Sequence, residues 1–353
     1  MHAIHDRVLE HLAAPRAEDF DAVALAVFRH QIEEIEPYRR YCERRGVSPD
    51  EVRSWTEIPP VPALVFKEIE LRCGPAERVF RSSGTTRGPE TRSTHALPDL
   101  RLYRAAARAG LRRFLFPDLP SMRLLSLVHP VAERPESSLA QMVEWAFEDF
   151  GADGSACAVR DGLLDVDVAA AVVRASERDG APLCLLATTA ALLHFFDAAG
   201  ERRWAFRLPH GSRVMDTGGS KGATRVLSRN GLRHLVWNAL AVPGYFFTNE
   251  YGMTELSSQA YENVIADRIA GRFAHRAYAA PPWLRTRVLD PATLREVPAG
   301  TPGLLCHCDL ANAGTALVVL TEDIGIAGAG GFQVMGRAAG AELRGCSLVW
   351  ELR

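Results

Sequence analysis

The chain has 353 residues, of which 47% are hydrophobic and 24% charged, an ordinary globular composition that can fill two or three structural units. The formal net charge of −2 gives no basic field, which argues against nucleic acid or an anionic membrane as a partner. Seven cysteines, no signal-like start and no apolar segment long enough to span a bilayer predict a cytoplasmic protein without membrane insertion.

The N-terminal region is predicted to be helical. Phe28, Ile32 and Ile35 recur at intervals of four and three residues, as on one face of a helix, and Pro37 interrupts that pattern. The proline-rich stretch 58–62 is a stiff connector. We therefore expect a helical segment over residues 1–60, packed on a main domain over residues 61–335.

The main domain has an alternating strand and helix pattern. Residues 122–128 and 183–187 are apolar runs typical of buried strands, and residues 303–310 and 316–320 are later strand candidates. Ser137 and Ser138 form an N-cap before an amphipathic stretch. Thr188 and Thr189 either cap the next helix or line an acyl pocket. The fold class is α/β, with strands flanked by helices.

The most informative segment is the run of small hydroxyl residues and glycines in Val79-Phe-Arg-Ser-Ser-Gly-Thr-Thr-Arg-Gly-Pro89. Backbone N–H groups left open by glycine, together with short hydroxyls, provide the many donors that nucleotide phosphates need. The run has neither the Gly-Lys-Ser/Thr of a Walker A loop nor the glycine spacing of a dinucleotide fingerprint. It is therefore either a phosphate loop of another kind or a polar surface turn.

Four motifs in order resemble the adenylate-forming superfamily, which includes acyl-CoA synthetases, luciferase and peptide-synthetase adenylation domains. The segment Ser82-Ser83-Gly84-Thr85-Thr86 is similar to the signature phosphate loop of that superfamily. Three further motifs follow in the superfamily's order: Tyr251-Gly252-Met253-Thr254-Glu255, Thr321-Glu322-Asp323 and Gly336-Arg337. The resemblance implies the large N-terminal domain of that superfamily, an α/β fold with mixed sheets.

Within the superfamily, the chain resembles most closely the acyl-protein synthetase family of bacterial bioluminescence, the fatty-acid-activating component of an acyl reductase complex. Four segments carry this likeness: Phe66-Lys67, Pro135-Glu-Ser-Ser-Leu139, Met215-Asp-Thr-Gly-Gly-Ser-Lys-Gly222 and Arg344-Gly-Cys-Ser-Leu348. It implies ATP and Mg²⁺ as cofactors, a carboxylic acid substrate, and a partner protein, either a reductase or a carrier protein, that accepts the acyl group.

The resemblance also implies roles for individual residues. Ser82, Ser83, Thr85 and Thr86 would hold the β- and γ-phosphates around Gly84. Tyr251 would lie against adenine beside Gly252, Thr254 would contact the α-phosphate, and Glu255 would help to hold Mg²⁺ through a carboxylate oxygen. Asp323 would accept from the ribose hydroxyls and Arg337 would lie near the ribose or phosphates. The alternatives are a core aromatic for Tyr251, a helix-terminus acid for Glu255 and a turn residue for Asp323.

Further candidates have weaker local patterns. Gly218 and Gly219 would let the backbone approach the nucleotide or acyl group, and Lys221 is either a cation for the carboxylate or phosphate or a solvated lysine. His129 ends a strand at a possible active-site mouth, or satisfies a local hydrogen bond.

Cys346 is the expected acyl acceptor, because a cysteine near the C-terminus carries the thioester in the resembling family and Arg337 and Arg344 would favour its thiolate. The alternative is a small buried cysteine. Cys306-His307-Cys308 could suggest a metal site, but no second cysteine pair lies at zinc-site spacing from it. We therefore predict that these are strand residues.

Two departures from the superfamily pattern bear on the mechanism. Glu90 stands where the superfamily carries a lysine after the proline of the loop. Residues 336–353 are expected to form a short tail, with the C-terminal lid domain absent, so a partner would cover the site or adenylation would be slow. Two other functions stay open: a stand-alone ligase that passes an aryl or acyl group to a carrier protein, an amine or CoA, and a non-catalytic adenylate-binding protein.

Overall fold

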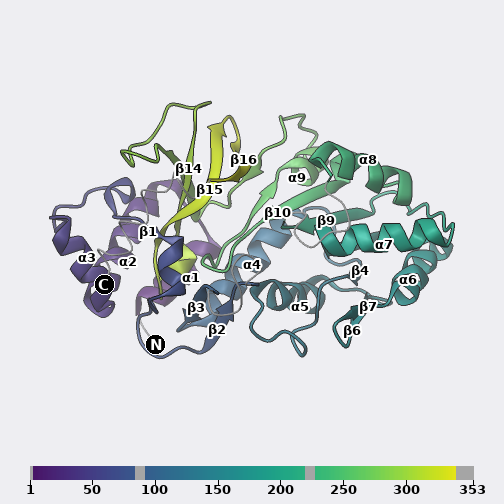
Figure 1. The fold of residues 1–353 in the computed structure, drawn as a ribbon, viewed down its shortest axis with the longest axis horizontal. Helices are drawn as coiled ribbons and strands as arrows, with labels where there is room; N and C mark the ends of the chain where they lie inside the picture. Colours follow the sequence, from purple (N-terminus) through teal and green to yellow (C-terminus); the bar gives the residue numbers. More distant parts are fainter. Residues whose placement is uncertain (1–2, 84–91, 219–226, 339–353) are drawn as a thin grey trace. The chain divides into compact units, whose positions relative to one another are not determined.

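The computed structural model describes residues 3–83, 92–218 and 227–338, and the chain forms two compact units (Figure 1). The first unit comprises Met1–Ala109, Met253–Ala260 and Ala277–Arg353, and the second comprises Gly110–Gly252 and Tyr261–Arg276. No helix within the described ranges is long and apolar enough to cross a membrane.

Three helices open the first unit: α1 (Ala3–Ala13), α2 (Phe20–Glu34) and α3 (Glu36–Arg44). The predicted helical face of Phe28 and Ile32 is confirmed, since both side chains are buried in the core of this unit. Pro37 lies in the first turn of α3, where its missing N–H costs nothing, and α2 ends just before it, as predicted. The 3₁₀ turn η1 (Ala17–Asp19) lies between α1 and α2, and two more, η2 (Trp55–Glu57) and η3 (Ala63–Lys67), follow α3.

The sheet of the first unit is mainly antiparallel. Its strands run in the order β13 (Leu284–Leu289), β14 (Pro302–Asp309), β15 (Val318–Gly328), β16 (Gly331–Arg337) and β12 (Tyr278–Ala279). The short strand β1 (Val61–Pro62) pairs with β15 in parallel, and η6 (Leu310–Asn312) follows β14. A separate hairpin pairs β2 (Arg78–Arg81) with β3 (Thr94–Leu97). Buried side chains from these strands and from α1 to α3 form one core, so the N-terminal helices are part of this unit.

The sheet of the second unit has a parallel centre. Its order is β11 (Ala260–Glu262), β10 (Phe247–Tyr251), β9 (Arg213–Thr217), β8 (Leu183–Thr188), β4 (Arg123–Ser126) and β5 (Ala156–Cys157), and the last five strands are parallel. Strands β8 and β9 are buried along nearly their whole length, which is why β8 is an apolar run, whereas the buried Arg213 and Asp216 of β9 have charged partners. A small hairpin joins β6 (Val159–Arg160) and β7 (Leu163–Leu164).

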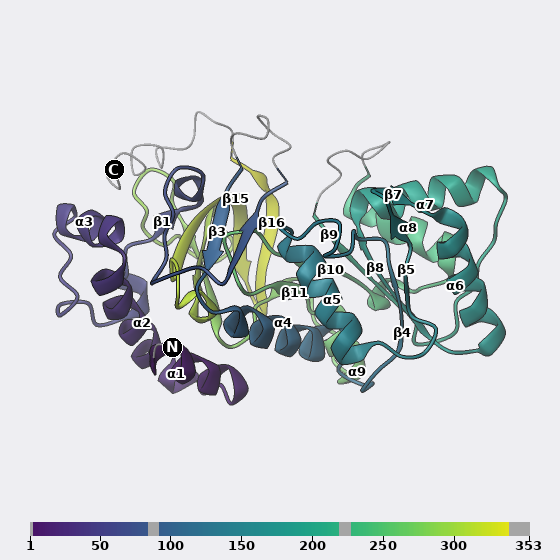
Figure 2. The same ribbon diagram turned by 90° about the horizontal axis from the view of Figure 1, so that it is seen from below.

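Helices cover both faces of this parallel sheet (Figure 2). Helix α5 (Ser138–Phe150) lies on one face, and α6 (Val166–Asp179), α7 (Thr189–Glu201) and α8 (Arg229–Leu240) lie on the other. This division follows from right-handed crossovers, because the step from β4 to β5 runs along the sheet in the opposite direction to the later steps. The turn η5 (Gly244–Phe246) and helix α9 (Val264–Ile269) complete the unit, and α4 (Leu100–Phe114) crosses the boundary between the two units.

Two predicted helix caps are confirmed. The Ser137 side chain accepts from Ala140 N at 3.2 Å at the start of α5. The Thr188 side chain accepts from Ala191 N at 3.2 Å at the start of α7, so capping is the observed role of this threonine. Together with the strands at the predicted positions, these helices confirm the α/β class.

Candidate active site

The two strands that flank the phosphate loop form an antiparallel hairpin. Arg81 pairs with Thr94, and one step further Ser82 N donates to Ser93 O at 3.0 Å while Ser93 N donates to Ser82 Oγ at 2.9 Å. The Arg92 side chain donates to the carbonyl of Ser82. Ser82 therefore has a fixed backbone at the base of the loop. Gly84, Thr85, Thr86 and Glu90 lie outside the described residues.

Glu255 lies in an irregular segment after β10, so the helix-terminus alternative is wrong. Its side chain is only 7% exposed, and burial raises the pKa of its carboxyl. A hydrogen bond from the Ser93 side chain and the positive charges of Arg337 and Lys67 act in the opposite direction. The carboxyl of Glu255 is therefore influenced by Ser93, which lies just after the phosphate loop, and by Lys67 of the Phe66-Lys67 motif.

Asp323 and Arg337 are partners across two neighbouring strands. They are paired in the register of β15 and β16, and Arg337 Nε lies 3.4 Å from Asp323 Oδ1. Asp323 N also donates to Thr321 Oγ1 at 3.0 Å, which links the first and last residues of the Thr-Glu-Asp motif. Asp323 is therefore a strand residue, and the turn alternative is wrong. Arg337 is largely exposed, so its guanidinium is available to an anionic ligand.

Whether a magnesium ion fits this site depends on the carboxylate oxygens of Glu255. A hard cation binds oxygen, and Mg²⁺ commonly takes one or two carboxylates beside substrate phosphates rather than a full protein cage. A buried carboxyl with a raised pKa supplies such an oxygen, and a nearby cation would favour its charged form. The described residues contain no cluster of three or more His, Cys, Asp or Glu side chains for a metal, so a protein-only cage is not what these ranges provide.

In the second unit, a buried polar cluster lies at the carboxyl ends of β9 and β10. Asp216 is fully buried and accepts from Thr189 Oγ1 at 2.7 Å, from Asn249 Nδ2 at 3.0 Å and from Arg229 Nη1 at 2.9 Å. The carboxyl ends of parallel strands are the usual ligand-binding edge of such a sheet. Thr189, which sequence reasoning placed either at a helix cap or in a pocket, thus belongs to this cluster.

The next residues of the same strands carry the predicted motifs. The Thr217 hydroxyl donates to Glu250, and burial raises the pKa of Glu250 to about 7, with the Asp216 charge adding to the rise. Gly218 has φ of +74°, a left-handed conformation that a side chain rarely tolerates, so glycine is required directly after β9. Tyr251 is the half-buried last residue of β10, and Gly252 follows it.

Three further predicted residues cannot be placed, and His129 has a local partner. Gly219, Lys221 and Cys346 lie outside the described residues. His129 follows β4 in the second unit, where its Nδ1 is 3.4 Å from Glu133 Oε2, a long contact. The same Glu133 carboxylate accepts from the backbone N–H groups of Asp161 and Gly162. His129 therefore has the local partner that its simpler interpretation requires, and a catalytic role for it stays a prediction.

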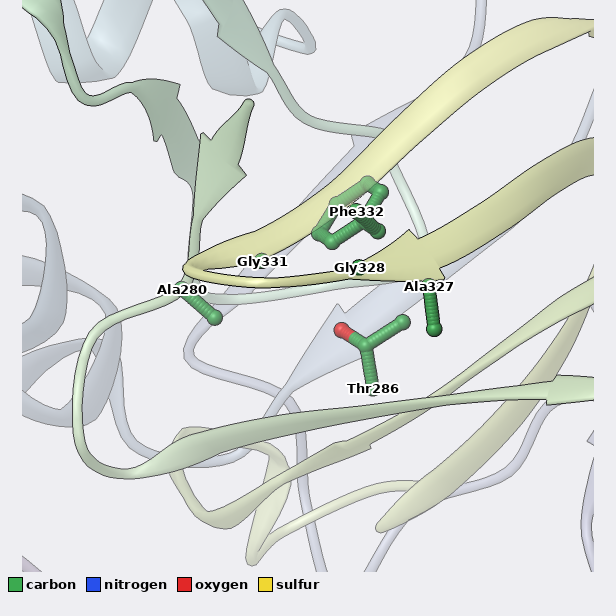
Figure 3. Close-up of a pocket in the computed structure, with 6 residues that line it drawn as sticks. All are labelled: Ala280, Thr286, Ala327, Gly328, Gly331 and Phe332. Atoms are coloured by element: carbon green, nitrogen blue, oxygen red, sulfur yellow. The ribbon is translucent and has the colours of Figure 1, made fainter. Parts of the chain in front are cut away.

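A separate pocket of about 230 Å³ lies in the first unit (Figure 3). The side chains that line it are apolar apart from the Thr286 hydroxyl, and the lining residues are Ala280, Thr286, Ala327, Gly328, Gly331 and Phe332. Gly331 has φ of +146°, and a Cβ there would lie 2.0 Å from Tyr278 O, so only glycine lets β16 pass β12. None of these residues belongs to the predicted nucleotide motifs.

Cys306 and Cys308 lie on β14, as the strand interpretation of this segment predicts. Both side chains are buried, and burial raises the pKa of the Cys306 thiol to about 12. His307 between them is also buried, with Nδ1 at 2.9 Å from Thr286 Oγ1. These residues pack within the first unit as buried strand residues.

The fold has clear relatives among solved structures. The chain resembles 2-hydroxyisobutyryl-CoA ligase in the postadenylation state in complex with 2-HIB-AMP, with a TM-score of 0.67 and 16% identity over 92% of this chain and 69% of that one. An open conformation of the same ligase, in complex with 2-HIB-AMP and CoA, gives a TM-score of 0.65 and 15% identity over 90% of this chain and 74% of that one. The fold is that of the adenylate-forming ligases, as the sequence motifs predicted.

The family is also shown. The family described as "Acyl-protein synthetase, LuxE" matches residues 6–352. A long-chain-fatty-acid–luciferin-component ligase of Vibrio harveyi is 22% identical over 310 residues, which cover 85% of this chain and 76% of that protein. A protein of the same name from Aliivibrio fischeri is 44% identical over 46 residues, 13% of this chain and 12% of that protein. The chain belongs to the acyl-protein synthetase family and is a carboxylate-activating ligase.

Sequence reasoning missed several polar residues that surround the predicted motifs. Asp216, Glu250 and Asp309 are carboxyl side chains in otherwise buried strands, and His95 lies on β3 just after the phosphate loop. For Asp309 the available signal was a carboxyl inside the apolar stretch predicted as a strand, because such a group must be paired or functional; the strands of Asp216 and Glu250 are too polar to give that signal.

Proposed function

We propose that the chain uses ATP and Mg²⁺ to convert a fatty or related carboxylic acid into an acyl-adenylate, and then transfers the acyl group to a thiol. One observation carries the first step: on β3, the strand that returns from the phosphate loop, His95 Nδ1 lies 2.7 Å from the backbone carbonyl of Thr254 in the Tyr-Gly-x-Thr-Glu motif. Two segments far apart in the sequence therefore meet as an ATP site requires.

In the proposed first step, a carboxylate oxygen of the acid attacks the α-phosphorus of ATP. The bond between the α-phosphorus and the bridging oxygen breaks, and pyrophosphate leaves with the electron pair. Such a reaction depends on positioning and on stabilising charge that is spread over phosphate oxygens. Mg²⁺, when bound, would neutralise part of that charge, and Glu255 would hold it.

The remaining roles follow the family pattern and the geometry of each residue. Ser82 and Ser83, with Gly84, Thr85 and Thr86, would hold the β- and γ-phosphates. Asp323 would accept hydrogen bonds from the ribose hydroxyls, and Arg337 is oriented by Asp323 and exposed enough to reach an anionic oxygen. Tyr251 would lie against adenine, Thr254 would contact the α-phosphate, and Gly218 with Gly219 would admit the ligand close to the backbone.

In the proposed second step, the Cys346 thiolate attacks the acyl carbonyl carbon, a thioester forms, and AMP leaves with the electron pair of the broken C–O bond. The other cysteines support this choice. Among the described residues, Cys42, Cys73, Cys184, Cys306 and Cys308 are buried, and burial raises the pKa of each thiol. Cys157 is the exposed cysteine in that part of the chain, which makes it the natural control.

The test is acyl labelling of the protein with a radiolabelled fatty acid and ATP, followed by neutral hydroxylamine, which cleaves thioesters. We expect a labelled wild-type chain, equal labelling of Cys157→Ser, and loss of the label in Cys346→Ser. Label that persists in Cys346→Ser and disappears in Cys157→Ser would move the acceptor to Cys157. Acyl-adenylate formation without any protein label would instead favour the stand-alone ligase, which transfers to a carrier protein, an amine or CoA.

A final acceptor on a partner protein, either a reductase or a carrier protein, is part of the same proposal. A thioester conserves the activation energy of the adenylate and can be exchanged with a second thiol without further ATP. Transfer of label from the isolated acyl-protein to an added acceptor thiol measures this step, and a thioester that is only hydrolysed would contradict it.

A further inference from the structure

His95 links three separate parts of the first unit. It lies on β3, is almost fully buried, and its Nδ1 is 2.7 Å from the backbone carbonyl of Thr254. Its Nε2 is 2.9 Å from the Thr315 hydroxyl, and the ring lies edge-on to Phe66 at 5.6 Å between centroids. The ring is therefore fixed by a contact on each nitrogen and by packing on one side.

The partners determine the tautomer of His95. A carbonyl oxygen can only accept, so Nδ1 must carry the hydrogen that is donated to Thr254. Nε2 then accepts from the Thr315 hydroxyl, whose other possible acceptor, the carbonyl of Asn312, is farther away at 3.4 Å. Burial also lowers the pKa of His95 to about 4, so the ring is neutral at physiological pH.

His95 and Ser93 act on adjacent residues of one motif. Ser93 and His95 are two positions apart along an extended chain, which places both side chains on the same side. Ser93 acts to lower the pKa of the Glu255 carboxyl, and His95 Nδ1 lies 2.7 Å from the carbonyl of the preceding residue, Thr254. The return strand of the phosphate loop therefore holds Thr254 directly, and Glu255 is its neighbour in the chain.

Other side chains fix the residues that follow. Asn312 Nδ2 donates to the Glu255 carbonyl at 2.9 Å, and the Asp309 carboxylate accepts from the backbone N–H groups of Ser257 and Ser258 at 3.1 and 2.8 Å. The Thr254 carbonyl, at the start of this segment, is tied to β3 by a hydrogen bond from His95 Nδ1 at 2.7 Å.

We propose that His95 is a positioning residue, whose neutral Nδ1–H donor fixes the Thr254 carbonyl and so sets the orientation of Thr254 and Glu255 relative to the phosphate loop. The structural part of this proposal stands on the contacts above, and its consequence for ATP rests on the proposed function.

Two substitutions test the roles of the two ring nitrogens of His95 separately. The amide of Asn ends close to the position of Nδ1 and can keep the donor to Thr254, whereas the amide of Gln reaches the position of Nε2 and loses that donor. We expect backbone amides of residues 253–258 in the free protein to exchange with deuterium about tenfold faster in His95→Gln than in wild type, because one buried hydrogen bond is lost. In His95→Asn the increase should stay below about threefold.

His307→Gln is the matched control, since His307 is another buried histidine of the first unit whose Nδ1 contacts Thr286 rather than this segment. It should leave exchange over residues 253–258 unchanged relative to the rest of the unit. Equal exchange in His95→Asn and His95→Gln, or no change in His95→Gln, would overturn the proposal.

The second readout is the KM for ATP in carboxylate-dependent pyrophosphate exchange. We expect His95→Gln to raise this KM about tenfold while the KM for the carboxylic acid stays within about twofold, whereas a simple loss of folded protein lowers kcat alone. An unchanged KM for ATP in a variant with accelerated amide exchange would contradict the functional half. If wild type catalyses no exchange with any acid, the proposed function fails, while the deuterium measurement still decides the role of His95.

Discussion

Gln31 on α2 offers a sharp test of how the N-terminal helices support the site. Its side chain is fully buried, and Nε2 donates to the carbonyls of Asn312 and Ala313 at 2.9 and 3.1 Å. Its Oε1 accepts from Leu317 N at 3.1 Å. These three bonds connect an N-terminal helix to the loop between β14 and β15, from which Asn312 holds the Glu255 carbonyl.

The substitution Gln31→Leu removes all three bonds at nearly constant volume. The Asn312 carbonyl keeps a second donor, the backbone N–H of Thr315 at 2.9 Å, whereas the Ala313 carbonyl keeps only the weak Cys73 thiol at 3.9 Å, so the Leu317 N–H and the Ala313 carbonyl carry most of the loss. Each buried backbone group without a partner costs about 1–3 kcal/mol. Two such groups, partly offset by the apolar burial of leucine, should lower the free energy of unfolding by about 3 kcal/mol.

Gln259→Leu is the matched control in the same unit. Gln259 is also buried, but its amide makes one long bond, to Ser257 O at 3.3 Å, and its Oε1 has no hydrogen-bond partner among the described residues. This substitution should cost less than about 1 kcal/mol. Thiol labelling of buried Cys42 and Cys308 as a function of urea reports the opening of this unit. Equal losses in the two variants would refute the assignment of stability to the Gln31 bonds.

Three further predictions concern single contacts. Arg213→Met should destabilise the protein by about 3–5 kcal/mol in urea unfolding, since fully buried Arg213 forms a bidentate pair with Asp118, and adding Asp118→Asn should recover part of the loss. Burial acts to raise the pKa of Asp118, but the Arg213 charge lowers it overall. The stabilisation from this pair is therefore complete above about pH 4 and is lost as pH falls through the lowered pKa of the folded protein. A constant difference in unfolding free energy between wild type and Arg213→Met down to strongly acid pH would contradict this. Arg337→Gln should change stability by less than about 1 kcal/mol because Arg337 is largely exposed, yet it should raise the KM for ATP; unchanged ATP kinetics would remove its proposed role. Thr188→Ala should cost about 1 kcal/mol as a lost helix cap without changing the preference for acyl chain length, whereas a changed preference would place Thr188 in the acyl pocket.

The elements that sequence reasoning placed well are those defined by local chemistry. The Ser137 and Thr188 caps depend on a hydroxyl three residues before a backbone N–H, and the buried strand β8 depends on a continuous apolar run. The strand predicted at 316–320 is β15, which continues to Gly328. Its second half was not predicted because Thr-Glu-Asp-Ile-Gly is polar and contains glycine, although pairing with β16 holds it extended.

The supports of the site depend on residues far apart in the chain. His95 contacts Thr254 and Thr315, and Gln31 contacts a loop beyond residue 310, so no local spacing or periodicity could reveal these pairs. Motif resemblance identified Glu255, Asp323 and Arg337, but their neighbours become visible only when the strands are assembled. The domain boundaries at residues 60 and 335, and the roles of Lys221 and Cys346, stay predictions.

The central claim is that this site adenylates a carboxylic acid, and the most direct measurement is exchange of labelled pyrophosphate into ATP across a panel of fatty and aryl acids. We predict exchange that requires Mg²⁺ and an acid, strongest with fatty acids, and reduced at least about tenfold in Glu255→Gln, because a metal-binding oxygen is replaced by an amide. Absence of exchange with every acid, or undiminished exchange in Glu255→Gln, would contradict the account.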